Sequence, residues 1–109
     1  MAVGLFKYNG DINDRNSEVV LSENISSQEF YDKYWERAIF ELKIKFLQDG
    51  AEIKKSNLEQ VLIELNLLKE WANKNLSNSD LEYMTTRIEN LEKVIPNALN
   101  NEDSLLYIY

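Results

Sequence analysis

Apolar residues recur at three- and four-residue intervals in three separate stretches of the chain, with polar residues between them. This spacing is typical of amphipathic helices, because it gathers the apolar side chains on one side. A Ser-x-x-Glu pattern, the signature of a capping box, precedes each stretch. The three pairs are Ser26 with Glu29, Ser56 with Glu59, and Ser79 with Glu82. We therefore predict helices over residues 27–48, 57–74 and 80–95, the last of them stopped by Pro96.

Two short stretches near the N-terminus and one at the far end of the chain are rich in β-branched and aromatic residues. Residues 3–8 and 18–21 are separated by turn formers, including Asn9-Gly10, which predicts a hairpin with a long loop. Residues 104–109, with the sequence SLLYIY, are strongly strand-prone as well. We predict that this last strand joins the sheet of the hairpin.

Together these elements describe one α+β domain over residues 1–109. We expect three main helices packed with a small antiparallel sheet formed by an N-terminal hairpin and a C-terminal strand. A length of 109 residues is typical of a single domain, and 44% hydrophobic with 28% charged residues is ordinary for a globular protein.

The first predicted helix is apolar on two sides. Its main stripe, at 100° per residue, consists of Tyr31, Trp35, Ala38, Ile39, Leu42 and Phe46. Phe40, Ile44 and Leu47 lie on nearly the opposite side, among charged residues. A helix of this kind is expected to lie between layers, with the sheet on one flank and helices on the other. We expect Trp35 to be a core residue.

The second predicted helix shows the same feature, and the third does not. One face of the second helix consists of Leu58, Val61, Leu62, Leu65, Leu68 and Ala72. Ile63, Leu67 and Trp71 form another stripe, which belongs either to the core or to a partner interface, because large exposed apolar patches are uncommon on solitary proteins. We expect partial exposure of Trp71. The third helix has one narrow stripe, formed by Leu81, Met84, Ile88, Leu91 and Ile95.

Composition and charge restrict the classes of function. The absence of Cys excludes disulfides and thiolate chemistry, and the absence of His removes the commonest general base and metal ligand. Nineteen acidic and twelve basic residues give a net charge of -7, which repels nucleic acid and anionic lipid and attracts basic macromolecules. No secretory or membrane-spanning pattern is visible. We expect a cytoplasmic protein that binds neither nucleic acid nor membranes.

No catalytic, cofactor or metal-binding motif stands out. The stretch from Asp11 begins with the spacing of a calcium loop, but Asn16 stands where such a loop requires Gly and Ser22 where it requires Glu. We therefore predict a non-enzymatic protein with no cofactor and no metal site.

The third predicted helix and the segment after it carry a concentration of acidic residues, with a tyrosine beside them. Together with Trp71 they form the candidate partner-binding set, which is Asp80, Glu82, Tyr83, Glu89, Glu92, Glu102, Asp103 and Trp71. On a docking surface, Tyr83 would supply contact energy and the acids would raise the association rate and the specificity. The alternative is a solvated helix face, with Asp80 placed to suit the helix dipole.

Three segments resemble small immunity proteins of bacterial polymorphic-toxin systems, including those of contact-dependent growth inhibition. These segments are ISSQEFYDKYWERAIFELKIKF, LEQVLIELNLLKEWANKNL and LLYIY. The resemblance is one of texture and layout over the central and C-terminal two thirds, and no site residue is carried over from it. It implies a cytosolic, non-enzymatic protein that binds a cognate toxin domain and blocks its active site or its access to substrate. The acidity of the chain favours a basic nuclease as that toxin.

Two alternatives from other classes stay open. One is a nucleic-acid-mimic inhibitor, whose acids would be spaced like phosphates, although acids alternate with Lys and Arg on the first two predicted helices. The other is a scaffold or homodimer built on Ile63, Leu67 and Trp71.

Overall fold

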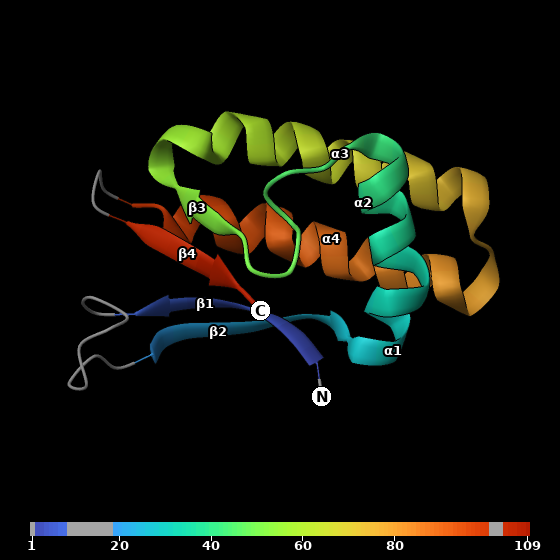
Figure 1. Cartoon of the computed structure of the whole chain (residues 1–109), viewed down its shortest axis with the longest axis horizontal. Helices are drawn as coiled ribbons and strands as arrows, with labels where there is room; N and C mark the ends of the chain where they lie inside the picture. Colours follow the sequence, from blue (N-terminus) through green and yellow to red (C-terminus); the bar gives the residue numbers. More distant parts are fainter. Residues whose placement is uncertain (1, 9–18, 101–103) are drawn as a thin grey trace.

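The computed structural model describes residues 2–8, 19–100 and 104–109. Over these residues the chain forms, in order, β1 (Ala2–Tyr8), β2 (Val19–Ser27), α1 (Gln28–Phe30), α2 (Glu36–Leu42), β3 (Glu52–Lys54), α3 (Leu58–Asn75), α4 (Asn78–Ala98) and β4 (Leu105–Ile108). A π-helical turn, Tyr31–Trp35, joins α1 to α2, and a 3-10 turn, Lys55–Asn57, leads into α3. The predicted α+β class is confirmed (Figure 1).

The sheet has the order β2-β1-β4-β3, and all neighbouring strands are antiparallel. The predicted N-terminal hairpin and the joining of the C-terminal strand to it are therefore confirmed. On one side of β4, Leu5 of β1 pairs with Ile108. On its other side, Ile53 of β3 pairs with Leu106. The sequence did not predict β3, because three residues with a single apolar side chain are too few to show strand alternation.

The first helical segment begins where predicted but ends earlier. Its N-cap is Ser27 rather than Ser26: the Ser27 hydroxyl accepts a hydrogen bond from the Phe30 N–H at 3.3 Å. The predicted end at residue 48 is wrong. Lys43 adopts a left-handed conformation, with φ 58° and ψ 45°, which ends α2 at Leu42.

The early end of α2 explains why this segment reads as apolar on two sides. After Lys43 the chain leaves the helix, so the residues that follow no longer share its axis. Ile44 and Leu47 are buried, at 2% and 0% exposure, whereas Phe40, which is still on the helix, is 86% exposed. Trp35 is fully buried, as predicted. The second stripe therefore does not form one face of a helix. Ile44 and Leu47 lie in a turn that packs into the core, and Phe40 is exposed on the helix.

The predicted second helix corresponds to α3, with a one-residue difference at each end. The predicted capping serine, Ser56, lies within the 3-10 turn. The side chain that caps this turn is that of Asn57. Its Oδ1 accepts a hydrogen bond from the Lys54 N–H at 2.9 Å.

The predicted third helix corresponds to α4, which is longer at both ends. It starts after Ser77 instead of Ser79, and it continues past Pro96. Proline has no N–H, so the last turn lacks one backbone hydrogen bond. Continuing the helix nevertheless places Ala98 and Leu99 in the core, at 9% and 2% exposure, and this burial favours the longer helix.

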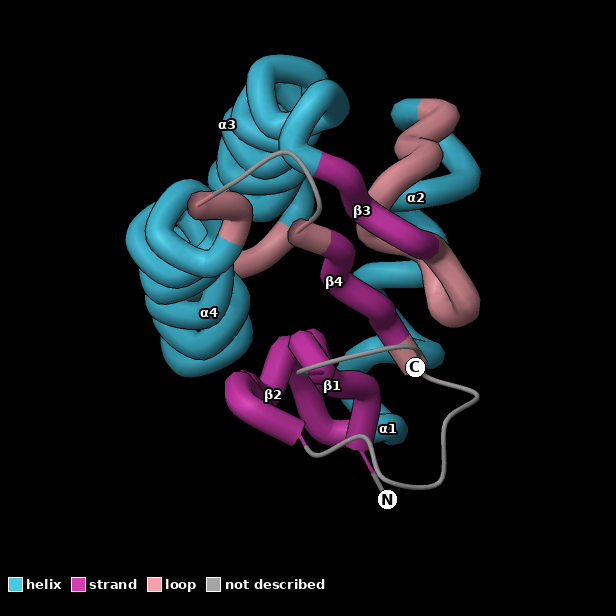
Figure 2. The backbone as a smooth tube through the Cα atoms, turned by 90° about the vertical axis from the view of Figure 1, so that its left-hand side faces the viewer, coloured by secondary structure: helices cyan, strands magenta, loops and turns pink. Residues whose placement is uncertain are grey.

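Both long helices cover the same side of the sheet. Figures 1 and 2 show α3 and α4 side by side there, with α2 running across their direction. The sheet contributes to the core Val3, Leu5, Ile53, Leu106 and Ile108. Lys7 of β1 reaches the end of α4, where its Nζ donates a hydrogen bond to the Ala98 carbonyl at 2.7 Å. A cation at this position also suits the negative end of the helix dipole.

Glu64 of α3 holds the segment that follows α2. Its side chain is 2% exposed, and it is the only buried carboxylate among the described residues. Its two oxygens accept hydrogen bonds from the backbone N–H groups of Lys45 and Phe46, at 3.0 and 2.9 Å. Hydrogen bonds to a charged group are about twice as strong as neutral ones, so this contact fixes the turn against α3.

We expect Glu64→Ala to lower the free energy of unfolding by about 2 to 4 kcal/mol, because two backbone donors lose a charged acceptor. Urea denaturation followed by circular dichroism measures this change. Glu59→Ala is the matched control, since Glu59 is an exposed acid on the same helix and its loss should cost less than about 0.5 kcal/mol. Equal small losses in both variants would show that the Glu64 contact does not hold the turn.

Candidate functional site

The predicted acidic residues of α4 are not all available to a partner. Glu82 and Glu89 are exposed. Asp80 is half-buried and accepts a hydrogen bond from the Tyr34 hydroxyl at 3.0 Å. Glu92 forms an ion pair with Lys69 of α3, with the carboxylate oxygen and Nζ 2.6 Å apart. Two of these acids therefore connect α4 to its neighbours in the fold.

Tyr83 also makes structural contacts. Its hydroxyl accepts a hydrogen bond from the Ser27 N–H at 3.1 Å, and its ring packs edge-on against Phe30 with centroids 4.6 Å apart. The Arg87 guanidinium lies over the Tyr83 ring, 5.2 Å from its centre. Tyr83 is half-buried as a result, and it joins the first turns of α4 to the junction of β2 and α1.

The exposed part of α4 has a mixed charge. Glu82 and Glu89 share it with Arg87 and with Lys93, which lies one helical turn after Glu89 and is exposed. The predicted residues Glu102 and Asp103 lie outside the described residues. The described part of this predicted surface, which we call the α4 face, is a patch of alternating charges, and its assignment as a docking surface stays a prediction.

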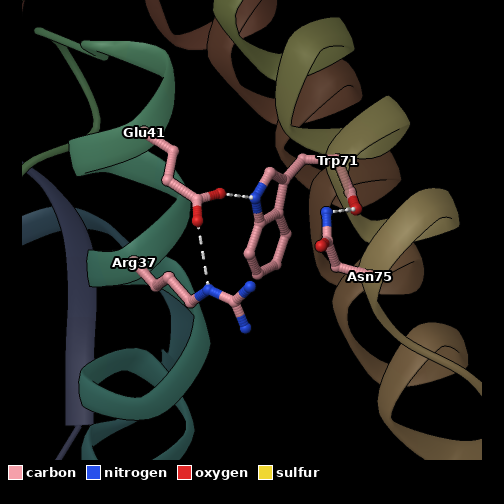
Figure 3. Close-up of polar contacts among 4 residues, drawn as sticks. All are labelled: Arg37, Glu41, Trp71 and Asn75. Atoms are coloured by element: carbon pink, nitrogen blue, oxygen red, sulfur yellow. Dashed lines mark hydrogen bonds and ion pairs between the residues drawn. The ribbon is translucent and has the colours of Figure 1, made fainter.

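Trp71 is buried, at 5% exposure, so the expected partial exposure of this residue is wrong. Figure 3 shows the reason: the indole of Trp71 lies against α2, and its Nε1–H donates a hydrogen bond to Glu41 at 2.5 Å. The same carboxylate accepts a hydrogen bond from Nε of Arg37 at 3.2 Å, and the Arg37 guanidinium lies 5.5 Å from the centre of the indole. Trp71 thus joins α3 to α2.

The rest of the predicted stripe on α3 is also partly covered by the fold. Leu67 is half-buried and packs against the core, and only Ile63, at 49% exposure, is open to solvent. The stripe of Ile63, Leu67 and Trp71 is therefore mostly a packing surface. It could not be recognised as such from α3 alone, because its covering residues come from α2.

Sequence reasoning missed a second aromatic group, which lies on the sheet outside the core. It consists of Phe6, Tyr8, Tyr107 and Tyr109, and we call it the aromatic sheet face. Phe6 stacks on Tyr109 with ring centroids 4.7 Å apart, and Tyr8 packs edge-on against Tyr107 at 5.8 Å. Aromatic residues two apart on both strands were the available signal, because side chains two apart in a strand share a face.

Close packing in the aromatic sheet face requires a glycine in β1. A Cβ at Gly4 would lie 2.9 Å from two carbons of the Phe6 ring. At the other end of the face, the hydroxyls of Tyr8 and Tyr109 are hydrogen-bonded. This bond, followed by partial burial, raises the pKa of Tyr109 to about 12. The face is thus a set of mutually packed rings with polar tips.

Phe40 of α2 is the most exposed large apolar side chain among the described residues, at 86%. It stands beside an open hollow lined partly by Glu36, Ile39, Ile44 and Gln48. The sequence placed Phe40 on the second apolar stripe of a helix expected to lie between layers, and the exposure of Phe40 shows that this expectation is wrong at that position.

The described residues contain no group of three or more acidic side chains arranged to hold a metal ion. None of the helices within them has the length and apolar character required to cross a membrane. Comparison of the chain with models of known protein families, with curated proteins and with solved structures found no match.

The contact between Glu41 and Trp71 predicts a dependence of stability on pH. The indole hydrogen bond and then the Arg37 guanidinium hold the pKa of Glu41 below its ordinary value of 4.5. A lowered pKa in the folded state stabilises the fold at pH values above the ordinary pKa, and this contribution disappears as the pH falls through the folded-state value. We expect Glu41→Gln to melt at a lower temperature than the parent at neutral pH.

This difference in melting temperature should shrink as the pH falls below about 4.5, because the carboxylate then becomes protonated in the unfolded chain, and it should vanish once the pH lies below the lowered pKa of the folded state. Thermal unfolding at neutral pH and at about pH 3 measures it, with Glu59→Gln as a control of equal charge change. A difference for Glu41→Gln that is the same at both pH values would exclude this role of the ionised carboxylate.

Proposed function

We propose that this chain is an immunity protein that neutralises a basic bacterial toxin domain by binding to it. The observation that carries the proposal is the net charge of -7. Most of the acidic residues that the structure describes are exposed at the surface. A field of this sign attracts a protein whose own cleft is positively charged because it binds phosphates. The segment resemblance to immunity proteins supplies the class of partner.

Charge complementarity acts mainly on the rate of association. Oppositely charged surfaces steer two proteins together at up to about 10⁸ M⁻¹s⁻¹ at low salt, and the rate falls as ionic strength rises. We expect a one-to-one complex with about 1,600 Å² of buried surface and nanomolar or tighter affinity, since little free toxin can be tolerated. In such a complex the bound protein blocks the toxin's active site or its access to substrate.

In this proposal the α4 face steers the toxin domain toward one end of the molecule. The first turns of α4 lie beside α1 and the π turn. Asp80 contacts Tyr34 of the π turn, and Tyr83 contacts Phe30 of α1. One partner of ordinary size can therefore cover the start of α4 together with α1 and the π turn. The exposed acids Glu82 and Glu89 steer the partner toward this end of the molecule.

The two other functional classes have less support. A nucleic-acid mimic needs a continuous acidic track, whereas Arg87 and Lys93 interrupt the acids of α4. A homodimer through the stripe of Ile63, Leu67 and Trp71 needs an exposed apolar surface, and the burial of Trp71 removes most of it.

The proposal is tested by expressing the chain together with the toxin domain encoded beside its gene. We expect cells that produce both to grow, cells that produce the toxin domain alone to die, and the two proteins to copurify in a one-to-one ratio. Death of cells that contain soluble chain would remove the immunity assignment for that toxin.

The steering role of α4 predicts a specific effect of charge reversal. Glu82→Lys with Glu89→Lys should slow association with the toxin domain at low salt and leave the fold intact, because exposed charges contribute little to stability. Stopped-flow measurement of association at several salt concentrations tests this. The matched control is Glu59→Lys with Glu70→Lys on α3, which changes the net charge equally at exposed positions. Equal slowing by both double variants would assign the steering to the total charge rather than to α4.

A further inference from the structure

Phe40 is exposed to an extent that its helix does not require. A phenylalanine side chain that is almost wholly exposed to water gains free energy when a partner buries it. Beside Phe40, the half-buried Ile39 and the buried Ile44 form the apolar part of an open hollow. An apolar anchor and an apolar recess therefore lie side by side on the outer surface of α2 and the turn that follows it.

This hollow continues into a second one, which is acidic. Glu36, Ile39 and Gln48 line both, and the second hollow adds Tyr31 and Asp49 and has a volume of about 170 Å³. Its lining contains two carboxylates and no basic side chain. Burial, followed by the negative charges of Asp49, Glu36 and Asp32, raises the pKa of Tyr31, which lies in the lining of the second hollow.

The first hollow differs from the second in its charge. Lys43 and Lys45 line the first hollow and not the second. Glu41, which also borders the first hollow, is already bound to Arg37 and Trp71. The two hollows thus differ in charge, and a difference of this kind favours one orientation of a charged partner.

The backbone beneath this surface is firmly held. Tyr31 donates a hydrogen bond from its hydroxyl to the Leu47 carbonyl at 2.8 Å, and Glu64 binds the N–H groups of Lys45 and Phe46. Ala38, on the inner side of α2, is fully buried. A surface that is ordered before binding loses little conformational entropy on binding, which favours affinity.

We propose that Phe40 and the two hollows beside it form the surface that holds the toxin domain, with Phe40 entering an apolar pocket of the partner and a partner Lys or Arg entering between Glu36 and Asp49. This inference rests on the proposed function, and it assigns the contact that the proposed function leaves open. The occupant is identified by charge complementarity, since a basic side chain of the partner suits the second hollow, which Glu36 and Asp49 line without a basic residue. The acids of α4 then govern association, and the surface around Phe40 governs dissociation.

The first experiment uses the toxin domain. Phe40→Ala should increase the dissociation rate about 30-fold or more, as expected for a central aromatic anchor, with little change in the association rate. Ile63→Ala is the control, because Ile63 is an exposed apolar side chain on α3 outside the surface. Dissociation rates that are equal for the two variants would overturn the proposal. Both variants should melt like the parent, since both side chains are exposed.

The second experiment does not depend on the identity of the toxin. A hexa-arginine peptide is titrated into the ¹⁵N-labelled chain, and the amide shifts are followed by NMR. We expect the largest shifts at residues 31–40 and 48–49. Glu36→Gln with Asp49→Asn should reduce them at least about threefold, in contrast to the control pair Glu59→Gln with Glu70→Gln, which removes equal charge from α3.

The two experiments separate the two proposals. Shifts centred on α4 or on α3, or equal shifts in the two double variants, would exclude this surface as the site for a basic side chain even if the chain protects cells. Shifts at the surface around Phe40 together with cell death in coexpression would instead retain the basic-side-chain site and remove the tested toxin as its partner.

Discussion

The buried carboxylate of Glu64 is the contact on which the arrangement of the rest of the chain depends. It binds the backbone of Lys45 and Phe46, and so fixes the turn after α2 against α3. A few residues later, Gly50 donates a hydrogen bond to the Ile108 carbonyl at 2.6 Å, and this places β3 beside β4. A buried carboxylate is costly unless it is fully hydrogen-bonded, so the acid and the turn require one another.

This constraint also shapes the outer surface of α2. Because the turn after Lys43 brings Ile44 and Leu47 into the core, the apolar residues that follow α2 are withdrawn from solvent. Phe40, three residues before Lys43, has no covering element among the described residues and stays exposed. The same turn brings Asp49 to the hollow that Glu36 also lines. A packing requirement thus produces the apolar and acidic surface to which we assign the partner.

Several polar residues that read as surface charges connect helices instead. Glu92 pairs with Lys69 between α4 and α3, Asp80 binds Tyr34, and Glu41 binds Trp71 between α2 and α3. Each of these acids has a partner within the chain, and a contact with another protein would have to displace it. The acids that stand exposed, such as Glu36, Glu82 and Glu89, are better placed to act on a partner.

The sequence by itself determined the α+β class, the hairpin, the joining of the last strand and the existence of three helical segments, because these follow from local spacing and propensity. It also placed Trp35 in the core. Tertiary structure alone decided the end of α2 at Lys43, the formation of β3 and the burial of Trp71. Each of these depends on a residue remote in sequence, namely Glu64, Leu106 and Glu41, respectively. Periodicity describes one element at a time, and so it cannot show which side chain will cover another.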